Sequence, residues 1–334
     1  MAGHTTFRIG GPADAFALPR DARALAALLR AARDGGFPAY LIGGGANLLV
    51  ADAGVRGLVI STAGLGGVRE IDSAAFASES PASAGGGAGN ADGVRVLYAG
   101  AGVPVTELVK RAAELGLGGL EFAAGLPGSV GGAVYMNARC YEREFADALS
   151  YVDYLPAALG GEAALGGEAA PTGDAGGEPA AADRPIAPLR LSVERGNWAY
   201  KRTPFMPGGP AAGAAVLGAA FVLRPAEPAA LEARMAELEA DRRAKGHFDY
   251  PSAGSLFKNN RDFGRPTGKI LDELGFRGAR VGDAMVSPKH ANIFVNAGRA
   301  TAADMVALIR RAQAAAREAF GFELEPEVVA LGDF

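Results

Sequence analysis

The stretch Ala39-Tyr40-Leu41-Ile42-Gly43-Gly44-Gly45-Ala46-Asn47 runs from a short apolar segment, typical of a buried strand, directly into three consecutive glycines. Consecutive glycines let backbone N–H groups turn toward one point and approach an anion closely. The stretch is neither a P-loop nor a dinucleotide fingerprint, because no Lys-Ser or Lys-Thr follows and residues 48–50 continue as an apolar run. Taken alone, it predicts either a tight turn between strands or an anion-binding loop.

A second glycine-rich run reads Gly125-Leu126-Pro127-Gly128-Ser129-Val130-Gly131-Gly132-Ala133. It is too rigid and too small-sided for a flexible linker, and such a run lets the backbone pass against a flat or charged ligand. A packed turn is the alternative interpretation. Two loops of this kind in one chain favour a single extended ligand that contains a pyrophosphate, such as FAD.

Strand and helix signals are mixed along the chain, which predicts an α+β fold. The last predicted helix opens at Thr301, with Asp304 as a capping-box-like partner, and ends at Gly321. The other predicted helices follow apolar periodicity and cover 22–32, 105–115, 229–245 and 267–274. The predicted strands include 15–18, 39–42, 57–61, 94–99, 291–295 and a final strand over 323–331.

Composition limits the function classes. The chain has 334 residues, of which 49% are hydrophobic, enough for two or three domains. A net charge of −4 argues against nucleic acid as a partner. The single cysteine, Cys140, excludes an internal disulfide and, with only three histidines, gives no expectation of a metal site.

Two further features concern the location of the chain in the cell and its surface. No apolar run is long enough to span a membrane, and residues 1–8 lack the apolar core of a signal peptide, so we expect a cytoplasmic protein. Residues 77–93 and 159–185 are rich in Ala, Gly, Glu, Ser and Pro. Because such segments bury too little apolar surface to offset the entropy of ordering, we expect surface insertions there.

Three more segments carry groups that suit a charged ligand. Tyr200-Lys201-Arg202-Thr203-Pro204-Phe205 places two cations beside an aromatic ring, which suits a carboxylate or phosphate, although a solvated surface pair is an equal alternative. Neighbouring side chains of an extended segment face opposite ways. We therefore expect only one of Lys201 and Arg202 to reach the ligand.

The run Ser252-Ala253-Gly254-Ser255-Leu256-Phe257-Lys258-Asn259 brings Ser255 close to a ligand, with Lys258 and Asn259 as donors. No histidine is near in sequence, which gives hydrolase chemistry little support, and a plain loop into a strand is the alternative. The last segment, Leu324-Glu325-Pro326-Glu327-Val328, places Glu327 before an apolar strand and says little by itself.

Together and in this order, these segments resemble the family of UDP-N-acetylenolpyruvoylglucosamine reductases, also called UDP-N-acetylmuramate dehydrogenases. The run from His4 to Ala13, the run from Val281 to Ala284 and His290 also match, so the resemblance covers nearly the whole chain except the two insertions. It implies an FAD-binding region of the vanillyl-alcohol-oxidase (PCMH) type over 1–202. A smaller α+β substrate domain over 203–320 and a C-terminal strand over 321–334 that returns to the flavin region complete the expected organisation.

Two details of the match define expectations about type and start. The short linker over 250–252 is similar to the shorter of the family's two types. Relatives carry a longer lead-in before the His4 to Ala13 motif, so we expect either a trimmed first strand or a start further upstream.

The resemblance implies NADPH-dependent, FAD-mediated reduction of UDP-N-acetyl-3-O-(1-carboxyvinyl)-glucosamine to UDP-N-acetylmuramate, a step of peptidoglycan precursor synthesis, by a monomer. Ser255 matches the proton donor, and Glu327 matches an acid beside the substrate carboxylate. The family usually has Tyr-Arg where this chain has Tyr200-Lys201, so Lys201 or Arg202 takes the role of the arginine. The implied substrate-binding residues are Tyr200, Lys258 and Asn259. The implied FAD-binding residues are Gly43, Gly44, Gly45, Ala46, Asn47, Gly125, Pro127, Gly128, Ser129, Gly131 and Gly132.

Two other hypotheses remain at this point. One is an oxidase of the same flavin fold that acts on a small alcohol or hydroxy acid, with His4 or Cys140 as the candidates for a covalent flavin link. The other is a non-catalytic flavin-binding relative, against which the presence of Ser255 and Glu327 counts.

Overall fold

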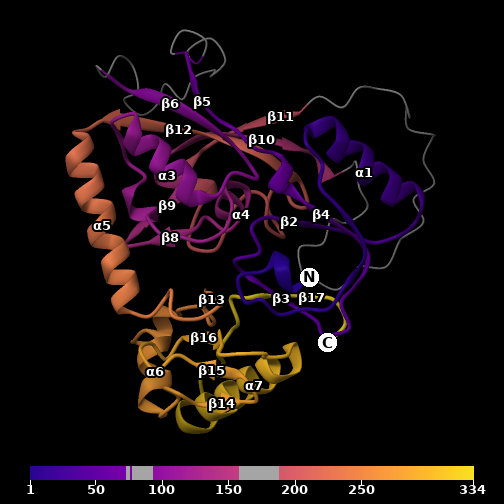
Figure 1. Cartoon of the computed structure of the whole chain (residues 1–334), viewed down its shortest axis with the longest axis vertical. Helices are drawn as coiled ribbons and strands as arrows, with labels where there is room; N and C mark the ends of the chain where they lie inside the picture. The colour runs from indigo at the N-terminus through magenta and orange to yellow at the C-terminus, as the bar shows by residue number, and fades with distance from the viewer. Residues whose placement is uncertain (73–75, 77–92, 158–187) are drawn as a thin grey trace. The chain divides into compact units, whose positions relative to one another are not determined.

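A computed structural model describes residues 1–72, 76, 93–157 and 188–334 (Figure 1). The expected surface insertions therefore lie outside the described residues, apart from Gly93 at the end of the first. Contacts divide the chain into two units. Unit 1 comprises Met1–Ala15, Gly44–Gly57 and Ala236–Phe334, and unit 2 comprises Phe16–Gly43 and Leu58–Met235. The functional boundaries at 202 and 320 stay a prediction.

Unit 2 is built on a six-stranded antiparallel sheet in the order β11-β10-β12-β6-β5, with β7 beside β12 (Figure 1). The long strand β12 is central, and its residues 215–221 are all buried. The strands are β5 (Val68–Ile71), β6 (Arg95–Gly100), β7 (Leu117–Gly118), β10 (Leu149–Leu155), β11 (Leu189–Ser192) and β12 (Ala215–Pro225).

Two helices of unit 2 cover this sheet. The short helix α4 (Val130–Tyr135) packs against β12 and β6, and α3 (Val105–Glu114) packs against α4 and β7. The apolar face of α3 follows helical spacing, because Leu108, Val109 and Ala112 are all buried. The predicted helix over 105–115 is thus confirmed to within one residue.

A smaller three-stranded sheet has the order β1-β4-β2, and β2 and β4 are parallel. Its strands are β1 (Ala13–Ala17), β2 (Ala39–Ile42) and β4 (Val55–Ser61). Helix α1 (Ala22–Asp34) packs on β2 and is capped by Asp21, whose carboxylate accepts the Ala24 N–H at 2.7 Å. Strands β8 (Arg139–Cys140) and β9 (Arg143–Glu144) form a separate hairpin.

Unit 1 contains a four-stranded antiparallel sheet in the order β13-β16-β15-β14 and a parallel pair of β3 with β17. Helix α7 packs against β14, β15 and α6 over a core that includes Phe257, Phe294, Met305 and Leu308 (Figure 1). The helices are α6 (Thr267–Glu273) and α7 (Ala302–Phe320), and α5 (Pro228–Ala244) carries the chain in from unit 2. The strands are β3 (Leu48–Val50), β13 (Ser252–Ser255), β14 (Arg280–Val281), β15 (Ala284–Val286), β16 (Ile293–Asn296) and β17 (Val329–Leu331).

The start and end of α7 confirm the prediction from sequence. Thr301 accepts the Asp304 N–H through its hydroxyl at 3.0 Å, and the Asp304 carboxylate accepts the Thr301 N–H at 3.0 Å, which is a capping box. Gly321 ends the helix with a φ of +70°, in the left-handed region where glycine has no steric cost. Short 3-10 helices lie at Ala2–His4, Thr62–Gly64, Glu121–Ala123, Phe145–Asp147, Arg195–Asn197 and Arg261–Phe263.

Two predictions about local structure are wrong. The final strand was expected over 323–331, but only β17 pairs with a neighbouring strand. The preceding segment makes a single bridge between Pro326 and Phe257, closed by the Lys258 N–H on the Glu325 carbonyl and the Glu327 N–H on the Leu256 carbonyl. The second glycine run is not only a loop, since its residues from Val130 onward form α4 with Ser129 as the N-cap.

Candidate active site

The two glycine-rich loops approach each other in unit 2. A Cβ added at Gly43 would lie 2.5 Å from the hydroxyl oxygen of Ser129, and one added at Gly131 would lie 2.8 Å from the Cβ of Ala101. Ser129 is itself buried and accepts the Gly132 N–H at 3.5 Å. Close packing therefore leaves little room for a side chain at either position, and the first loop contacts the second through Gly43 and the Ser129 hydroxyl.

The rest of the first loop packs in the same way within unit 1. Gly45 has a φ of +64°, and a Cβ there would lie 2.0 Å from the carbonyl oxygen of His4. The Thr6 N–H donates to the Gly45 carbonyl at 3.1 Å. The first glycine loop thus rests on the His4 to Ala13 motif, which explains why both segments appear together in the sequence resemblance.

Asn47 connects the end of this loop to the C-terminal segment. Its side-chain amide donates to the Glu327 carbonyl at 2.9 Å, and its own carbonyl accepts the Val329 N–H at 2.9 Å. Residues 280 positions apart are thereby held together. Asn47 was predicted to bind FAD, and in the structure its side chain fixes the backbone of the predicted catalytic Glu327.

Unit 1 brings Ser255 and Glu327 to adjoining positions. Ser255 is the last residue of β13 and stands opposite Ile293 of β16. The Glu327 N–H donates to the carbonyl of Leu256, the next residue after Ser255, at 2.7 Å. The two predicted catalytic residues therefore lie on backbone segments that are directly hydrogen-bonded, and both side chains are half-buried.

Asn292 organises this arrangement, although the sequence alone does not indicate it. Its side-chain oxygen accepts the Phe257 N–H at 3.0 Å and its amide donates to the Phe257 carbonyl at 2.9 Å, so it pairs with the backbone like a neighbouring strand. Its own carbonyl accepts the Leu256 N–H at 2.8 Å. A single asparagine 37 positions beyond Ser255 carries no local signal, although an asparagine at the start of an apolar strand is a candidate for such a role.

Lys258 and Asn259 already have partners in the chain. The Lys258 ammonium forms an ion pair with Glu325. The side-chain oxygen of Asn259 accepts the Thr267 N–H at 3.0 Å at the start of α6. The predicted substrate-binding role of both residues stays a prediction. To bind substrate, Lys258 would share its ammonium with Glu325, and Asn259 would use its side-chain NH2 group.

The segment Tyr200 to Phe205 is not extended as expected. Ala199 and Arg202 exchange two backbone hydrogen bonds of 3.0 and 3.1 Å, which makes Tyr200 and Lys201 the two central residues of a tight turn. Tyr200 has a negative φ and Lys201 a φ of +54°, the sign pattern of a type II turn. The expected alternation of Lys201 and Arg202 is therefore wrong, because these residues sit at a corner and not along a strand.

Lys201 and Arg202 differ in their surroundings at this turn. The Lys201 ammonium lies 5.8 Å from the centre of the Tyr200 ring, and Lys201 is half-buried. Arg202 is exposed. Since a cation that acts on a ligand works best where water is partly excluded, this difference favours Lys201.

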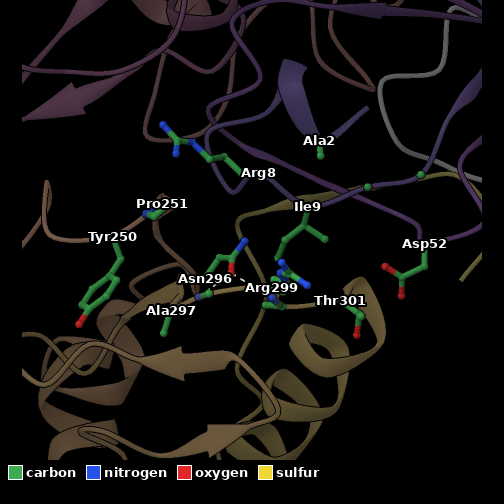
Figure 2. Close-up of a pocket in the computed structure, with 14 residues that line it drawn as sticks. Ala2, Arg8, Ile9, Asp52, Tyr250, Pro251, Asn296, Ala297, Arg299 and Thr301 are labelled. Carbon is green, nitrogen blue, oxygen red and sulfur yellow. Dashed lines mark hydrogen bonds between the residues drawn. The ribbon is translucent and has the colours of Figure 1, made fainter.

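Unit 1 also has a depression of about 600 Å³ that holds none of the predicted site residues (Figure 2). Its wall is organised by the buried Asn296, whose amide donates to the Phe7 carbonyl at 3.1 Å. Asp52 lies at its rim and accepts the N–H groups of Ala302 and Ala303 at 2.7 and 2.9 Å. The depression lies beside the start of α7 and is lined in part by residues 8–11 of the His4 to Ala13 motif.

The composition of the glycine loops is compatible with an FAD molecule. Added Cβ atoms at Gly43, Gly45 and Gly131 would meet atoms of the chain itself within 3 Å, so these positions carry no side chain that could cover the backbone. Bare backbone suits a flat ligand with a pyrophosphate, because N–H groups can point at the phosphate oxygens without steric hindrance. No group of His, Cys, Asp and Glu within the described ranges is arranged to hold a metal ion.

Comparison with known proteins identifies the class and then the family. Residues 13–160 match the FAD binding domain model, and residues 246–331 match the model of the UDP-N-acetylenolpyruvoylglucosamine reductase C-terminal domain. With the glycine loops described above, the first match makes this chain an FAD-dependent oxidoreductase and confirms the α+β fold of the vanillyl-alcohol-oxidase type. The second match, and the relatives that follow, show that the chain belongs to the family of UDP-N-acetylenolpyruvoylglucosamine reductases.

The relatives match over nearly their whole length. The UDP-N-acetylenolpyruvoylglucosamine reductase of Treponema pallidum is 38% identical over 100% of this chain and 92% of its own. That of Agathobacter rectalis is 40% identical over 100% and 93%. The crystal structure of the enzyme from Thermus caldophilus is similar with a TM-score of 0.68 and 29% identity, covering 99% of this chain and 96% of that one. No helix within the described ranges is both long and apolar enough to cross a membrane.

Proposed function

We propose that this chain reduces the enolpyruvyl ether of UDP-N-acetylglucosamine to UDP-N-acetylmuramate, with NADPH as the electron source, in peptidoglycan precursor synthesis. The observation that carries the assignment of residues is the backbone pairing that sets Ser255 beside Glu327 in unit 1. FAD, when bound, supplies the redox chemistry, since it accepts a hydride from NADPH and passes it to the methylene carbon of the enolpyruvyl group. The residues of the chain supply position, charge and a proton.

Ser255 is the proposed proton donor. Addition of a hydride to the methylene carbon leaves the neighbouring carbon, which bears the carboxylate, in need of a proton. A serine hydroxyl is a weak acid, so it can act only on a strongly basic enolate that is held in a fixed position. The end of β13 provides that rigidity, because Leu256 and Phe257, which follow Ser255, are tied to Asn292 by three hydrogen bonds.

Glu327, as an acid that shares its proton, and Lys201, as a cation, are proposed to stabilise the charge that develops on the substrate carboxylate. A donor aimed at a developing oxyanion lowers the barrier because its interaction strengthens in the transition state. Lys201 supplies a positive charge but not the bidentate fork of an arginine. Arg202 is the alternative cation, and its greater exposure makes it the weaker candidate.

The remaining assignments extend this proposal. Gly43–Asn47 and Gly125–Gly132 are proposed to bind FAD, and Tyr200, Lys258 and Asn259 to bind the UDP-sugar. We assign FAD binding to residues 1–202 and substrate binding to residues 203–320. Residues 321–334 are assigned as the C-terminal strand that returns to the flavin region. The protein is proposed to act in the cytoplasm, where NADPH and nucleotide sugars are found, as a monomer without a nucleic-acid or membrane partner.

An anaerobic two-step experiment tests the function. The protein, loaded with FAD, is first mixed with NADPH, and the flavin absorbance near 450 nm is expected to bleach. Addition of the enolpyruvyl UDP-sugar is then expected to restore the absorbance without oxygen, with formation of UDP-N-acetylmuramate. Bleached flavin that recovers only on admission of oxygen would instead support an oxidase of the same fold.

A further inference from the structure

We propose that Asn137 and Thr203 are positioning residues for the Tyr200–Lys201 turn. They thereby fix the position of the Lys201 ammonium relative to the C-terminal end of α4. The inference rests on the proposed role of Lys201. It assigns to two buried polar residues, which have no part in the resemblance as catalytic groups, a function in the half of the reaction that uses the UDP-sugar.

The turn needs external support because its backbone is unfavourable for lysine. Position i+2 of a type II turn has a positive φ and favours glycine or asparagine. Lys201 occupies that position with a φ of +54°. A non-glycine residue held in this region persists only where the surrounding structure determines it, and such residues are concentrated at functional sites.

Asn137 supplies the first support. It is fully buried and lies two residues after the end of α4, and its side-chain amide donates to the carbonyl of Ala199 at 3.1 Å, at the first residue of the turn. Its side-chain oxygen accepts the Ala146 N–H at 3.0 Å. Both ends of the side chain are thus used, which fixes its orientation and with it the position of Ala199.

Thr203 supplies the second support on the other side of the turn. It is 2% exposed, and its hydroxyl donates to the carbonyl of Tyr135, the last residue of α4, at 2.9 Å. The same oxygen accepts the Phe205 N–H at 3.3 Å. The residues that flank the turn are therefore both tied to the C-terminal end of α4.

Aromatic side chains pack beside the residues that precede and follow the turn, but they do not fix its orientation. The rings of Trp198 and Phe205 lie edge to face with centres 6.4 Å apart, and Tyr154 contacts Phe205 in the same manner at 5.7 Å. Such contacts are not directional enough to select one rotation of the turn. The two side-chain hydrogen bonds to carbonyl groups supply that direction.

The consequence is specific to one half of the reaction. If the Lys201 ammonium acts on the substrate carboxylate, an error in its position weakens that interaction and slows reoxidation of the flavin by the UDP-sugar. Reduction of the flavin by NADPH makes no use of this cation and should be unaffected. A residue that merely stabilised the fold would change both halves or the flavin content.

Thr203→Val is the main variant, since it keeps the shape and removes the hydroxyl, and Thr203→Ser is the matched control that keeps the hydroxyl. The free energy of one buried hydrogen bond, if it is lost in the transition state, corresponds to about a tenfold change in rate. We expect Thr203→Val to slow reoxidation of the flavin by the UDP-sugar about tenfold, with unchanged FAD content and an unchanged rate of reduction by NADPH. Thr203→Ser should restore the rate.

Comparison with Lys201→Ala separates positioning from general structure. In the Lys201→Ala background, Thr203→Val should cause no further slowing, because the group that it positions is absent. The inference would be overturned if the double variant were slower than Lys201→Ala by the same factor that Thr203→Val alone causes. A Thr203→Val enzyme that is as fast as Thr203→Ser would also overturn it. A Lys201→Ala enzyme with normal reoxidation would instead remove Lys201 from the proposed function, and the inference with it.

Asn137→Asp provides a second variant should Thr203→Val fold poorly. Aspartate keeps the oxygen that accepts the Ala146 N–H and replaces the donor to Ala199 with a second acceptor. The same selective slowing of reoxidation is expected, together with the same absence of effect in the Lys201→Ala background. Equal slowing of reduction and reoxidation would show that Asn137 only maintains the fold.

Discussion

At the level of single residues, substitution of Ser255 should affect only one of the two half-reactions, and the two can be measured separately. Ser255→Ala should leave reduction of the flavin by NADPH fast and lower turnover by roughly two to four powers of ten, as for the loss of a positioned acid. Stopped-flow absorbance of each half-reaction is the measurement. Ser252→Ala is a matched control, since Ser252 lies on the same strand opposite Val295 and has no proposed role.

The result for Ser255→Ala can also reject the assignment. If both half-reactions slow equally, Ser255 shapes the site and does not donate a proton. If neither slows while Glu327→Gln abolishes turnover, the proton comes from the glutamate or from water that it orders.

The lysine at position 201 is expected to lower the stability of the fold while it increases the reaction rate. Lys201→Gly should raise the free energy of unfolding by about 1 kcal/mol, because glycine adopts a positive φ without strain. The same change should raise the reaction barrier by about 3 kcal/mol through loss of the charge. Urea unfolding and steady-state turnover are the two measurements, and Lys201→Ala separates them, since alanine removes the charge but keeps the strain.

Arg202→Ala tests the competing assignment of the cation. With Lys201 as the active group, Arg202→Ala should keep most of the turnover. A larger loss with Arg202→Ala than with Lys201→Ala would place the catalytic charge one residue later, on the flank of the turn. If neither change matters, the charge comes from elsewhere, and Lys258, released from its ion pair with Glu325, is the first residue to test.

At the level of elements, the start of α7 is capped from two directions. Thr301 caps it locally, and Asp52, 250 residues earlier in the chain, accepts the N–H groups of Ala302 and Ala303. Asp52→Ala should lower the free energy of unfolding by about 1 kcal/mol, because two N–H groups at a helix N-terminus lose a charged acceptor. Denaturant unfolding measures this effect. Asp34→Ala is the control, since it removes the same charge from an exposed ion pair with Arg33.

The same helix shows which elements can be predicted from a sequence. Thr301, Asp304 and Gly321 define α7 by local chemistry, and its limits were predicted correctly. The contribution of Asp52 could not be predicted, because nothing near residue 52 indicates which N–H groups its carboxylate will accept.

In the candidate site, too, local features could be predicted from the sequence and long-range contacts could not. The small residues of its two glycine loops were recognisable as ligand-binding candidates, but the approach of Gly43 to Ser129 depends on packing between segments 86 positions apart. The Tyr200–Lys201 turn lacks the glycine or asparagine that usually marks its type, so an extended segment was the natural but wrong expectation. The supports of the site, Asn137 and Asn292, are single polar residues whose partners are distant.

At the level of the whole molecule, the chain passes between its units more than once. Unit 1 is assembled from three segments and unit 2 from two. Hydrophobic periodicity identifies elements but carries no information about which distant segments share a core. Boundaries drawn in chain order, such as 202 and 320, therefore describe functional assignments and not the contact units, and their test is the half-reaction behaviour of variants on either side.

The stability of unit 1 should depend on pH through two histidines. His247 and His290 lie with ring centres 6.4 Å apart. Burial lowers the pKa of His247 to about 4, and the nearby charge of Arg242 adds to the effect. Burial also lowers the pKa of His290, with Arg277 contributing. Both rings are thus neutral in the folded chain at a pH where an exposed histidine would already be protonated.

The sign of the effect follows from proton binding. Below about pH 6.5 the unfolded chain binds protons at these positions that the folded chain does not, and for His247 this difference lasts down to about pH 4, so the free energy of unfolding falls as the pH falls. Above about pH 7 both states are neutral and the contribution vanishes. We expect the urea midpoint to drop between pH 7.5 and pH 5, and His247→Gln to reduce this drop while leaving the midpoint at pH 7.5 nearly unchanged.

Hydrogen exchange assigns the effect to one unit. Amides of α7, in the same unit as both histidines, should lose protection at pH 5 relative to pH 7.5 after correction for the intrinsic exchange rate, whereas amides of β12 in unit 2 should change less. In His247→Gln the loss in α7 should shrink toward that of β12. An equal loss in both units, or a pH dependence that His247→Gln leaves intact, would mean that groups other than the two buried histidines control stability between pH 7.5 and pH 5. Asp147 is not such a group: hydrogen bonds from the Glu144 N–H, Arg195 and Arg143 outweigh burial and hold its pKa below the ordinary value, so its contribution is lost only at lower pH.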